Sequence, residues 1–231
     1  GLAHKKLDFF YPTSIGFNTE LSSFQSYIRN QENIIFPIVA QPFTEIKYMM
    51  GDKKEQHLEV LFSREFLPNF FITLNYDIDF SPGVYKRSKM QNSFFNGNLR
   101  YNTKNGRYGI SGYYYNNKID IQESGGIKYD SVFINNIETD KSIIDVNLTG
   151  ATNLIKVSGF AVDQYFNISG NKSDGKNDSI SSRRFGIGRI NHHFAYQRNR
   201  YIYEDTNPLS YFYQSFDHVI DSTKTSDSIY F

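Results

Sequence analysis

The sequence predicts an all-β protein made of antiparallel strands, and three observations support this prediction. From Phe70 to Phe80 every second residue is apolar, with Thr73, Asn75 and Asp77 between them, and a period of two is typical of a strand whose faces meet different surroundings. The chain holds 21 Phe and 18 Tyr at a mean hydropathy of −0.52, which suits strands better than helices. The sequence indicates no helix of any length.

The same alternation recurs along the chain between turn and loop signals. Short polar turns are expected at 51–54, 67–69 and 102–106, the last because Asn and Gly tolerate positive φ. Longer loops are expected at 81–91, 118–142 and 167–182. The nine or ten predicted strands cover 15–23, 43–50, 56–65, 70–80, 93–101, 107–117, 143–150, 153–166 (with mixed faces), 185–203 and 211–220.

Alternation alone fits either a soluble β-sandwich, with its apolar side chains facing a core, or a membrane β-barrel. Aromatic-rich apolar faces, and strands of about ten residues that could cross a bilayer at a tilt, favour the barrel. Mid-strand charges fit either fold. No stretch approaches the roughly 18 to 20 apolar residues of a spanning helix, and lipid admits only helices and closed barrels. We therefore predict an antiparallel transmembrane β-barrel, with short turns at one rim and long loops at the other.

Composition and spacing exclude several kinds of chemistry. With 25 basic and 24 acidic residues the net charge is +1, so no bulk field selects nucleic acid, and the absence of cysteine removes disulfides and thiolate metal sites. His192 and His193 are neighbours on a predicted strand and point to opposite faces, so they cannot share an ion there. Asp77 and Asp79 lie about 7 Å apart on one face, a spacing that suits a glycosidase pair, but alternation already explains it. The sequence predicts no enzyme, cofactor or metal site.

Charged residues on the polar faces are the candidate functional residues. In a barrel they would line the lumen and set its charge preference for a solute. The alternative is that they solvate a filled lumen or pair across strands. The candidates are Glu20, Glu45, Lys47, Glu59, Asp77, Asp79, Arg100, Asp145 and Arg189.

Five segments occur in an order that matches a known family: PFTEIKYMMGDKKEQHLEVLFSRE (42–65), SPGVYKR (81–87), NTKNGRYGISG (102–112), QESGGI (122–127) and NRYIYEDTNP (199–208). Together they resemble the Bacteroidetes putative porin family over nearly the whole chain. Phe43 and Ser124 depart mildly from its pattern, where Tyr and Asn are expected. The resemblance implies an outer-membrane β-barrel of a Gram-negative bacterium, in a family whose members are longer than this chain.

The end of the sequence is a poor closing strand. Phe231 and Ile229 fit the alternating apolar pattern of such a strand, but Asp227, Thr225 and Thr223 before them do not. We therefore expect residues 1–231 to form a single transmembrane region, the N-terminal part of a larger barrel, incomplete at both ends.

The resemblance implies a porin through which small solutes diffuse passively, with outer-membrane lipid as its surroundings. The alternatives are a non-conducting barrel subunit of a larger outer-membrane assembly, with other outer-membrane proteins as partners, and a soluble β-sandwich binding module. Asp130-Ser131-Val132, Asp178-Ser179-Ile180 and Asp227-Ser228-Ile229 resemble the acceptor pattern of Bacteroidetes O-glycosylation. Ser131, Ser179 and Ser228 are therefore expected O-glycan sites.

Overall fold

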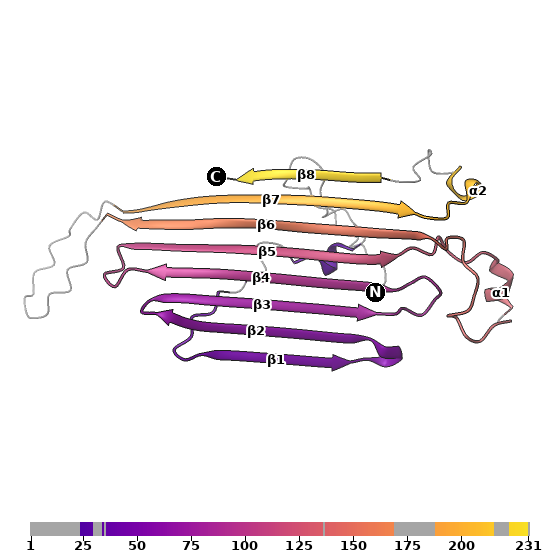
Figure 1. Cartoon of the computed structure of the whole chain (residues 1–231), viewed down its shortest axis with the longest axis horizontal. Coiled ribbons are helices and arrows are strands. Elements are labelled where there is room, and N and C mark those ends of the chain that lie inside the picture. Colours follow the sequence, from indigo (N-terminus) through magenta and orange to yellow (C-terminus); the bar gives the residue numbers. More distant parts are fainter. Residues whose placement is uncertain are drawn as a thin grey trace, which may run out of the picture.

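The computed structural model describes residues 24–29, 34, 36–135, 137–168, 188–214 and 222–230, with 25, 133 and 222–230 described by backbone alone. Eight strands form a single sheet in the order β1 to β8 (Figure 1). Each strand pairs antiparallel with the next one along the chain, so the sheet is a simple meander.

The strands lengthen from 8 residues in β1 to 17 in β6 and β7, and the last strand, β8, has 9. Among the described residues, helices are limited to segments of three to five residues, which lie before β1 or in the connections between strands. The elements are η2 (Gln25–Tyr27), β1 (Phe43–Met50), η4 (Asp52–Lys54), β2 (Gln56–Leu67), β3 (Phe70–Ser81), β4 (Met90–Asn102), β5 (Tyr108–Gln122), α1 (Asp130–Ile134), β6 (Ala151–Asn167), β7 (Arg189–Asp205), α2 (Ser210–Tyr213) and β8 (Ser222–Tyr230).

Seven of the predicted strands are confirmed. The first, 43–50, has the predicted bounds, and the others have shifted ends: 56–65, 70–80, 93–101, 107–117, 153–166 and 185–203. The strand predicted at 143–150 is wrong, because this segment forms only an isolated bridge between Ile127 and Val146. Its alternating Ile144, Val146 and Leu148 are nevertheless buried, so the alternation recorded burial on one side of a loop and not strand pairing. The strand predicted at 211–220 is wrong at its start, because residues 211–213 belong to α2, and residues 215–220 fall outside the described residues. The strand predicted at 15–23 also falls outside them.

The predicted separation of short turns from long loops is only partly correct. In a meander, successive connections alternate between the two rims. The connections 68–69 and 103–107 therefore share a rim with the long connection after β6, while the short connection 51–55 joins the long ones at 82–89 and 123–150. The rim that carries the connections 51–55, 82–89 and 123–150 is the right-hand edge in Figure 1, where α1 and α2 lie.

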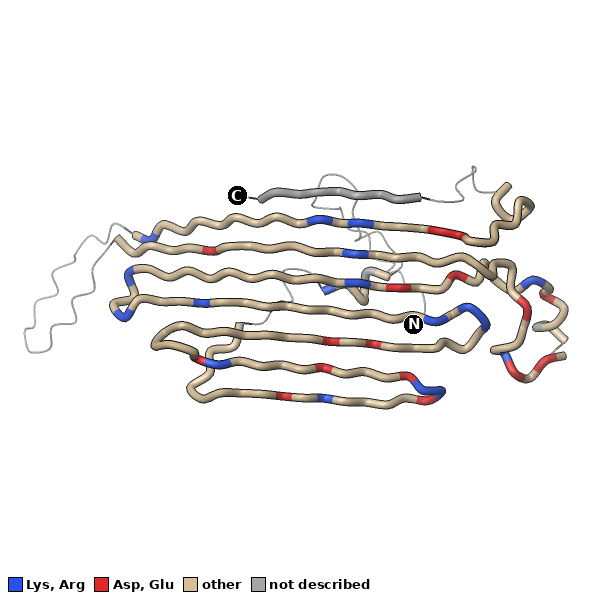
Figure 2. Tube along the Cα trace, in the orientation of Figure 1, with Lys and Arg blue, Asp and Glu red and all other residues tan. Residues whose placement is uncertain are grey.

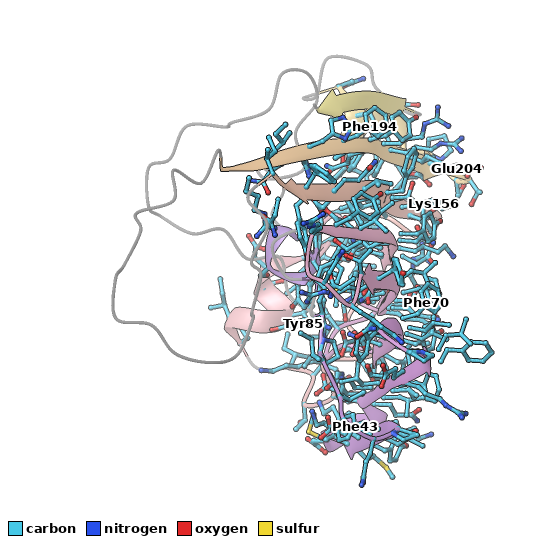
Figure 3. The ribbon with its side chains drawn as sticks, turned by 90° about the vertical axis from the view of Figure 1, so that its left-hand side faces the viewer. Phe43, Phe70, Tyr85, Lys156, Phe194 and Glu204 are labelled. Carbon is cyan, nitrogen blue, oxygen red and sulfur yellow. The ribbon has the colours of Figure 1, made fainter. Side chains whose placement is uncertain are left out.

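The described strands form one layer, as the view along the strands in Figure 3 shows. A soluble β-sandwich requires a second sheet packed on the first, and the described residues contain no second sheet. Within this set β1 pairs only with β2 and β8 only with β7, so the sheet is open and the predicted barrel is not closed by these strands.

The sheet has two chemically different faces. Cross-strand partners share a face, so the register shows which strand residues lie on the same face of the sheet. The inner face carries Asp77 and its register partners and contacts residues 24–29. The outer face carries the alternating apolar residues of β3, and Figure 3 shows Phe70, Lys156 and Glu204 on this side of the ribbon. Leu74 and Tyr76 there are 42% and 40% exposed.

The hydrophobic core lies on the inner face of β4 to β6, beneath the N-terminal segment. It contains Phe24 and Ile28 from that segment, and Phe94, Tyr113, Tyr115, Ile119, Ile155 and Val157 from the strands. This explains why the faces of 153–166 are mixed in the sequence. The inner positions of β6 are buried under a covering segment while several outer positions are apolar as well, so alternation is weak where both faces meet apolar surroundings.

Candidate functional site

A row of charged side chains crosses the inner face from β1 to β3. Lys47, Glu59 and Asp77 are successive register partners on neighbouring strands. Lys47 Nζ lies 3.3 Å from a carboxylate oxygen of Glu45 and 3.5 Å from one of Glu59. Strand pairing therefore places Lys47 beside the opposite charge of Glu59, but places the two carboxylates of Glu59 and Asp77 side by side, and Figure 2 shows the charged positions aligned across these strands.

Asp77 is the most buried member of this row, with 1% of its side chain exposed. Its Oδ2 lies 2.6 Å from Nη1 of Arg29, which comes from the N-terminal segment. The Arg29 guanidinium also lies over the ring of Phe94, 5.1 Å from its centroid. A buried carboxylate needs such a partner, because its charge is costly in a dry environment.

The segment Phe24–Arg29 is fastened to the inner face by polar contacts as well as by its apolar side chains. The backbone N–H of Arg29 donates to Oδ1 of Asn117 at 3.0 Å, and Nδ2 of Asn117 donates back to the carbonyl of Arg29 at 2.8 Å. Asn92 donates to the carbonyl of Tyr27 at 3.3 Å. Further along, Phe36 packs edge-on against Tyr113 with centroids 5.5 Å apart. The inner face of β3 to β5 is therefore covered by this part of the chain.

Two histidine–aspartate pairs lie on the inner face at different places. Nδ1 of His57 is 2.5 Å from Oδ1 of Asp79, and Nδ1 of His193 is 2.5 Å from Oδ1 of Asp163. The first pair adjoins Glu59 and Asp77. The second lines a cavity of about 470 Å³ together with Arg100 and Arg189. The first pair therefore has two further carboxylates beside it, and the second has two arginines.

The structure places the predicted lining residues as follows. Glu45, Lys47, Glu59, Asp77, Asp79, Arg100 and Arg189 lie on the inner face, as their alternation predicted. Asp145 lies in the loop between β5 and β6, outside the sheet, because the strand predicted there does not form. Its side chain is 68% exposed and pairs with Lys86 at 3.0 Å. Glu20 is outside the described residues.

Sequence reasoning missed Arg29, Asn117 and His57 as members of this inner-face cluster. His57 and Asn117 stand at inward positions of alternating strands, so the period of two places them on this face. Arg29 lies in a segment with no strand pattern. Nothing local indicates its partner, because the contact joins residues 29 and 77 through the tertiary structure.

The expected O-glycan sites lie in three different settings. Ser131 is exposed on α1, Ser228 is on β8, and Ser179 is outside the described residues. Glycosylation stays a prediction, which mass spectrometry of the native protein would test.

The outer face carries an oblique apolar band. On β3 every outward side chain from Phe70 to Phe80 is apolar, whereas on β5 Tyr114 is followed by polar residues from Asn116 onward. Tyr76 and Asn116 are in the same register row, joined through Phe95. Beyond the band Lys118, Lys156 and Arg200 form one basic row. Exposed large apolar residues of the outer face in this band include Ile46, Tyr48, Met50, Leu74, Tyr76, Phe95, Leu99, Tyr101, Tyr114, Phe160, Phe166 and Ile190.

The opposite limit of the band moves in the same direction. On β2 Arg64, opposite Ile72, interrupts the apolar series, and Leu67 lies opposite Phe70, the last outward apolar residue of β3. On β5 the series continues one outward position further still, to Tyr108. From β3 to β5 both limits shift in the same direction, so the band crosses these strands at an angle. From β5 to β7 the limits stay in two rows, that of Tyr114, Phe160 and Tyr196 and that of Tyr108, Phe166 and Ile190.

These features define a class: an all-β protein whose single antiparallel sheet exposes an apolar band on one face and carries a charged polar row on the other. The chain belongs to a porin family, since the family described as "Putative porin" matches residues 1–231, the whole chain. Membership of this family implies a location in the outer membrane. Neither the curated proteins nor the solved structures include a match to the chain.

Among the described residues, no helix has the length and apolar character needed to cross a membrane.

Proposed function

We propose that the chain forms part of an outer-membrane channel for passive diffusion of small solutes, with the charged inner face lining the pathway. The oblique band is the observation that supports this most directly. Strands in membrane barrels are tilted by about 35–45°, so a level layer of hydrocarbon meets successive strands at successive heights. An oblique apolar band is the pattern that such a tilt produces.

The apolar stretch of β3, the longest in the band, fits the thickness of a membrane. From Phe70 to Phe80, ten steps of about 3.4 Å give about 34 Å along the strand. Projected through a tilt of about 40°, this is about 26 Å, close to the roughly 25 Å apolar band of outer-membrane barrels. We further propose that the open edges at β1 and β8 are paired in a closed barrel, because unpaired backbone groups are not tolerated in lipid. Family membership also favours a channel over an enzyme.

Planar-bilayer recording of the purified full-length protein tests this function. We expect stepwise conductance whose ion preference shifts toward cations in Lys47→Glu, since Lys47 lies on the inner face. The matched control is Lys118→Glu on the outer face, which should leave the preference unchanged. Absence of steps, or equal shifts in both variants, would contradict the proposal.

A second candidate, a non-conducting barrel subunit of an outer-membrane assembly, is favoured by the covering of the inner face by Phe24–Arg29. The same recording separates the two candidates. If the wild-type protein conducts no current but Arg29→Gln does, the chain forms a channel that the segment Phe24–Arg29 blocks. Silence in both would favour the structural subunit.

A further inference from the structure

Three potential metal ligands meet on the inner face near the start of β2. His57 and Glu59 come from β2, and Asp77 comes from β3 opposite Glu59. Each offers a ligand atom, and these atoms lie within 4.8 Å of one another. A histidine nitrogen with two carboxylate oxygens is a donor set that suits Zn²⁺ and related divalent ions.

Asp77 provides an independent sign of a ligand. Its side chain is 1% exposed, yet Oδ1 has no hydrogen-bond partner among the residues that the structure describes. Arg29 approaches the other oxygen, Oδ2. A buried carboxylate oxygen without a donor is costly, and a cation is one group that satisfies it.

Asp79 orients the imidazole of His57 for this role. Its Oδ1 lies 2.5 Å from Nδ1 of His57, so Nδ1–H can donate to the carboxylate and leave the lone pair of Nε2 for a metal. A carboxylate behind a ligating histidine fixes the tautomer and raises the basicity of the ligand. An adjacent cavity of about 330 Å³, lined by His57, Asp79, Tyr27 and Met90 among others, leaves room for water as a further ligand.

We propose that His57, Glu59 and Asp77 bind a divalent transition-metal cation such as Zn²⁺, in competition with Arg29. The charges explain the competition. Nη1 of Arg29 lies 2.6 Å from Oδ2 of Asp77, so the guanidinium and a bound cation would compete for the same buried carboxylate and repel each other there.

The competition links the metal to the covering segment. Asp77 is the only ion-pair partner of Arg29 within the described part of the chain, so a cation that takes Asp77 removes the charge contact that holds Phe24–Arg29. The contacts of Asn117 remain. Metal binding should therefore loosen the segment without unfolding the sheet.

His193 provides a matched control within the same protein. It has the same 2.5 Å contact to an aspartate on the same face, but Arg100 and Arg189 line its surroundings. The described residues contain only one group of three potential ligands, and His193 is not in it.

Isothermal titration of the full-length protein in detergent with Zn²⁺ tests the proposal. We expect a single site with a dissociation constant in about the micromolar range. His57→Gln and Glu59→Gln should each weaken binding at least about tenfold, as should Asp79→Asn through its effect on His57. His193→Gln should leave binding unchanged, and Arg29→Gln should tighten it by about tenfold because the competing charge is gone.

A spin label on Ser26→Cys reports the covering segment, because the chain has no other cysteine and Ser26 is exposed. Zn²⁺ should increase the mobility of this label in the wild-type background and have no effect in His57→Gln. The proposal is overturned if wild type binds no Zn²⁺ below about 1 mM, if His57→Gln and His193→Gln behave alike, or if Arg29→Gln binds no more tightly than wild type.

Discussion

β3 and β5 have different outer faces although only β4 separates them. β3 is apolar at every outward position from Phe70 to Phe80, while β5 becomes polar after Tyr114. The change occurs within single register rows, since Tyr76 on β3 and Asn116 on β5 share one. The row of a residue in the hydrogen-bond ladder therefore does not decide whether its outward side chain is apolar.

The two strands differ on the inner face as well. β3 holds Arg29 by charge, through Asp77, and β5 holds the backbone of the same residue by neutral hydrogen bonds, through Asn117. The covering segment is thus held by one contact that depends on salt and pH and one that depends on neither. Three matched pairs of substitutions test these differences between β3 and β5. A fourth pair tests two acidic residues in the loop that follows β5.

The largest effect is expected for an arginine placed in the shared row. Tyr76→Arg should destabilise the membrane-embedded protein by about 2–4 kcal/mol, because the charge enters the apolar band. Asn116→Arg should cost only about 0–1 kcal/mol, the value near an interface. Urea unfolding from lipid vesicles measures both, and equal costs would contradict the oblique band.

The next effect concerns the two contacts of Arg29. Asp77→Ala should cost about 2–3 kcal/mol, below the full penalty for a broken buried pair because Arg29 is 36% exposed and can rehydrate. Asn117→Ala should cost about 1–2 kcal/mol for its lost hydrogen bonds. Added salt should reduce the destabilisation caused by Asp77→Ala and leave that caused by Asn117→Ala unchanged. If the ratio of the two destabilisations is the same in unfolding measured at low and at high salt, the electrostatic role of Asp77 is wrong.

A smaller effect is expected from removing single hydroxyl groups. The hydroxyl of Tyr115 on β5 donates to Oε1 of Gln197 at 2.7 Å in a buried setting, so Tyr115→Phe should cost about 1 kcal/mol. Tyr76 on β3 is 40% exposed, and Tyr76→Phe should be close to neutral. Thermal unfolding in detergent is sufficient, and a larger loss in Tyr76→Phe would reverse the assignment of the two faces.

The smallest effect is a pH dependence at the loop that follows β5. Burial raises the pKa of Glu123, although the Asn153 amide opposes this in part. The folded state then holds its proton to higher pH than the unfolded chain, so stability should fall as pH rises from the ordinary glutamate pKa through the raised value. Glu123→Gln should remove this slope in unfolding measured across acidic pH.

Asp145 in the same loop serves as the opposite control. Its hydrogen bond and charge contact with Lys86 lower the pKa of Asp145, so its contribution is present above the ordinary aspartate pKa and is lost as pH falls through the lowered value. Asp145→Asn should therefore remove a contribution that rises with pH, whereas Glu123→Gln removes one that falls with pH. If the two substitutions remove pH slopes of the same sign, these assignments are wrong.

Much of the sheet was predictable because alternation is a local property. Glu45, Lys47, Glu59, Asp77 and Asp79 are on the face that the period of two assigns to them. The failures occur where a local pattern has more than one cause. Ile144, Val146 and Leu148 alternate because one side of a loop is buried, which the sequence does not distinguish from a strand.

The candidate site was predictable in its strand residues and not in its covering segment. The carboxylates and His57 follow from strand geometry, but Arg29 reaches Asp77 across residues 30–76. A sequence pattern cannot assign such a contact, because the period of a strand is read over neighbouring residues and the pairing of distant segments depends on how they pack.

The sequence by itself determined that the chain forms antiparallel strands with one apolar and one polar face, because the side-chain period of a strand is fixed by backbone geometry. The tertiary structure decided the register, which makes the apolar band oblique, and it decided that Phe24–Arg29 covers the inner face. Both depend on contacts between residues far apart in the chain, whose free energies are set only when the strands are aligned and packed.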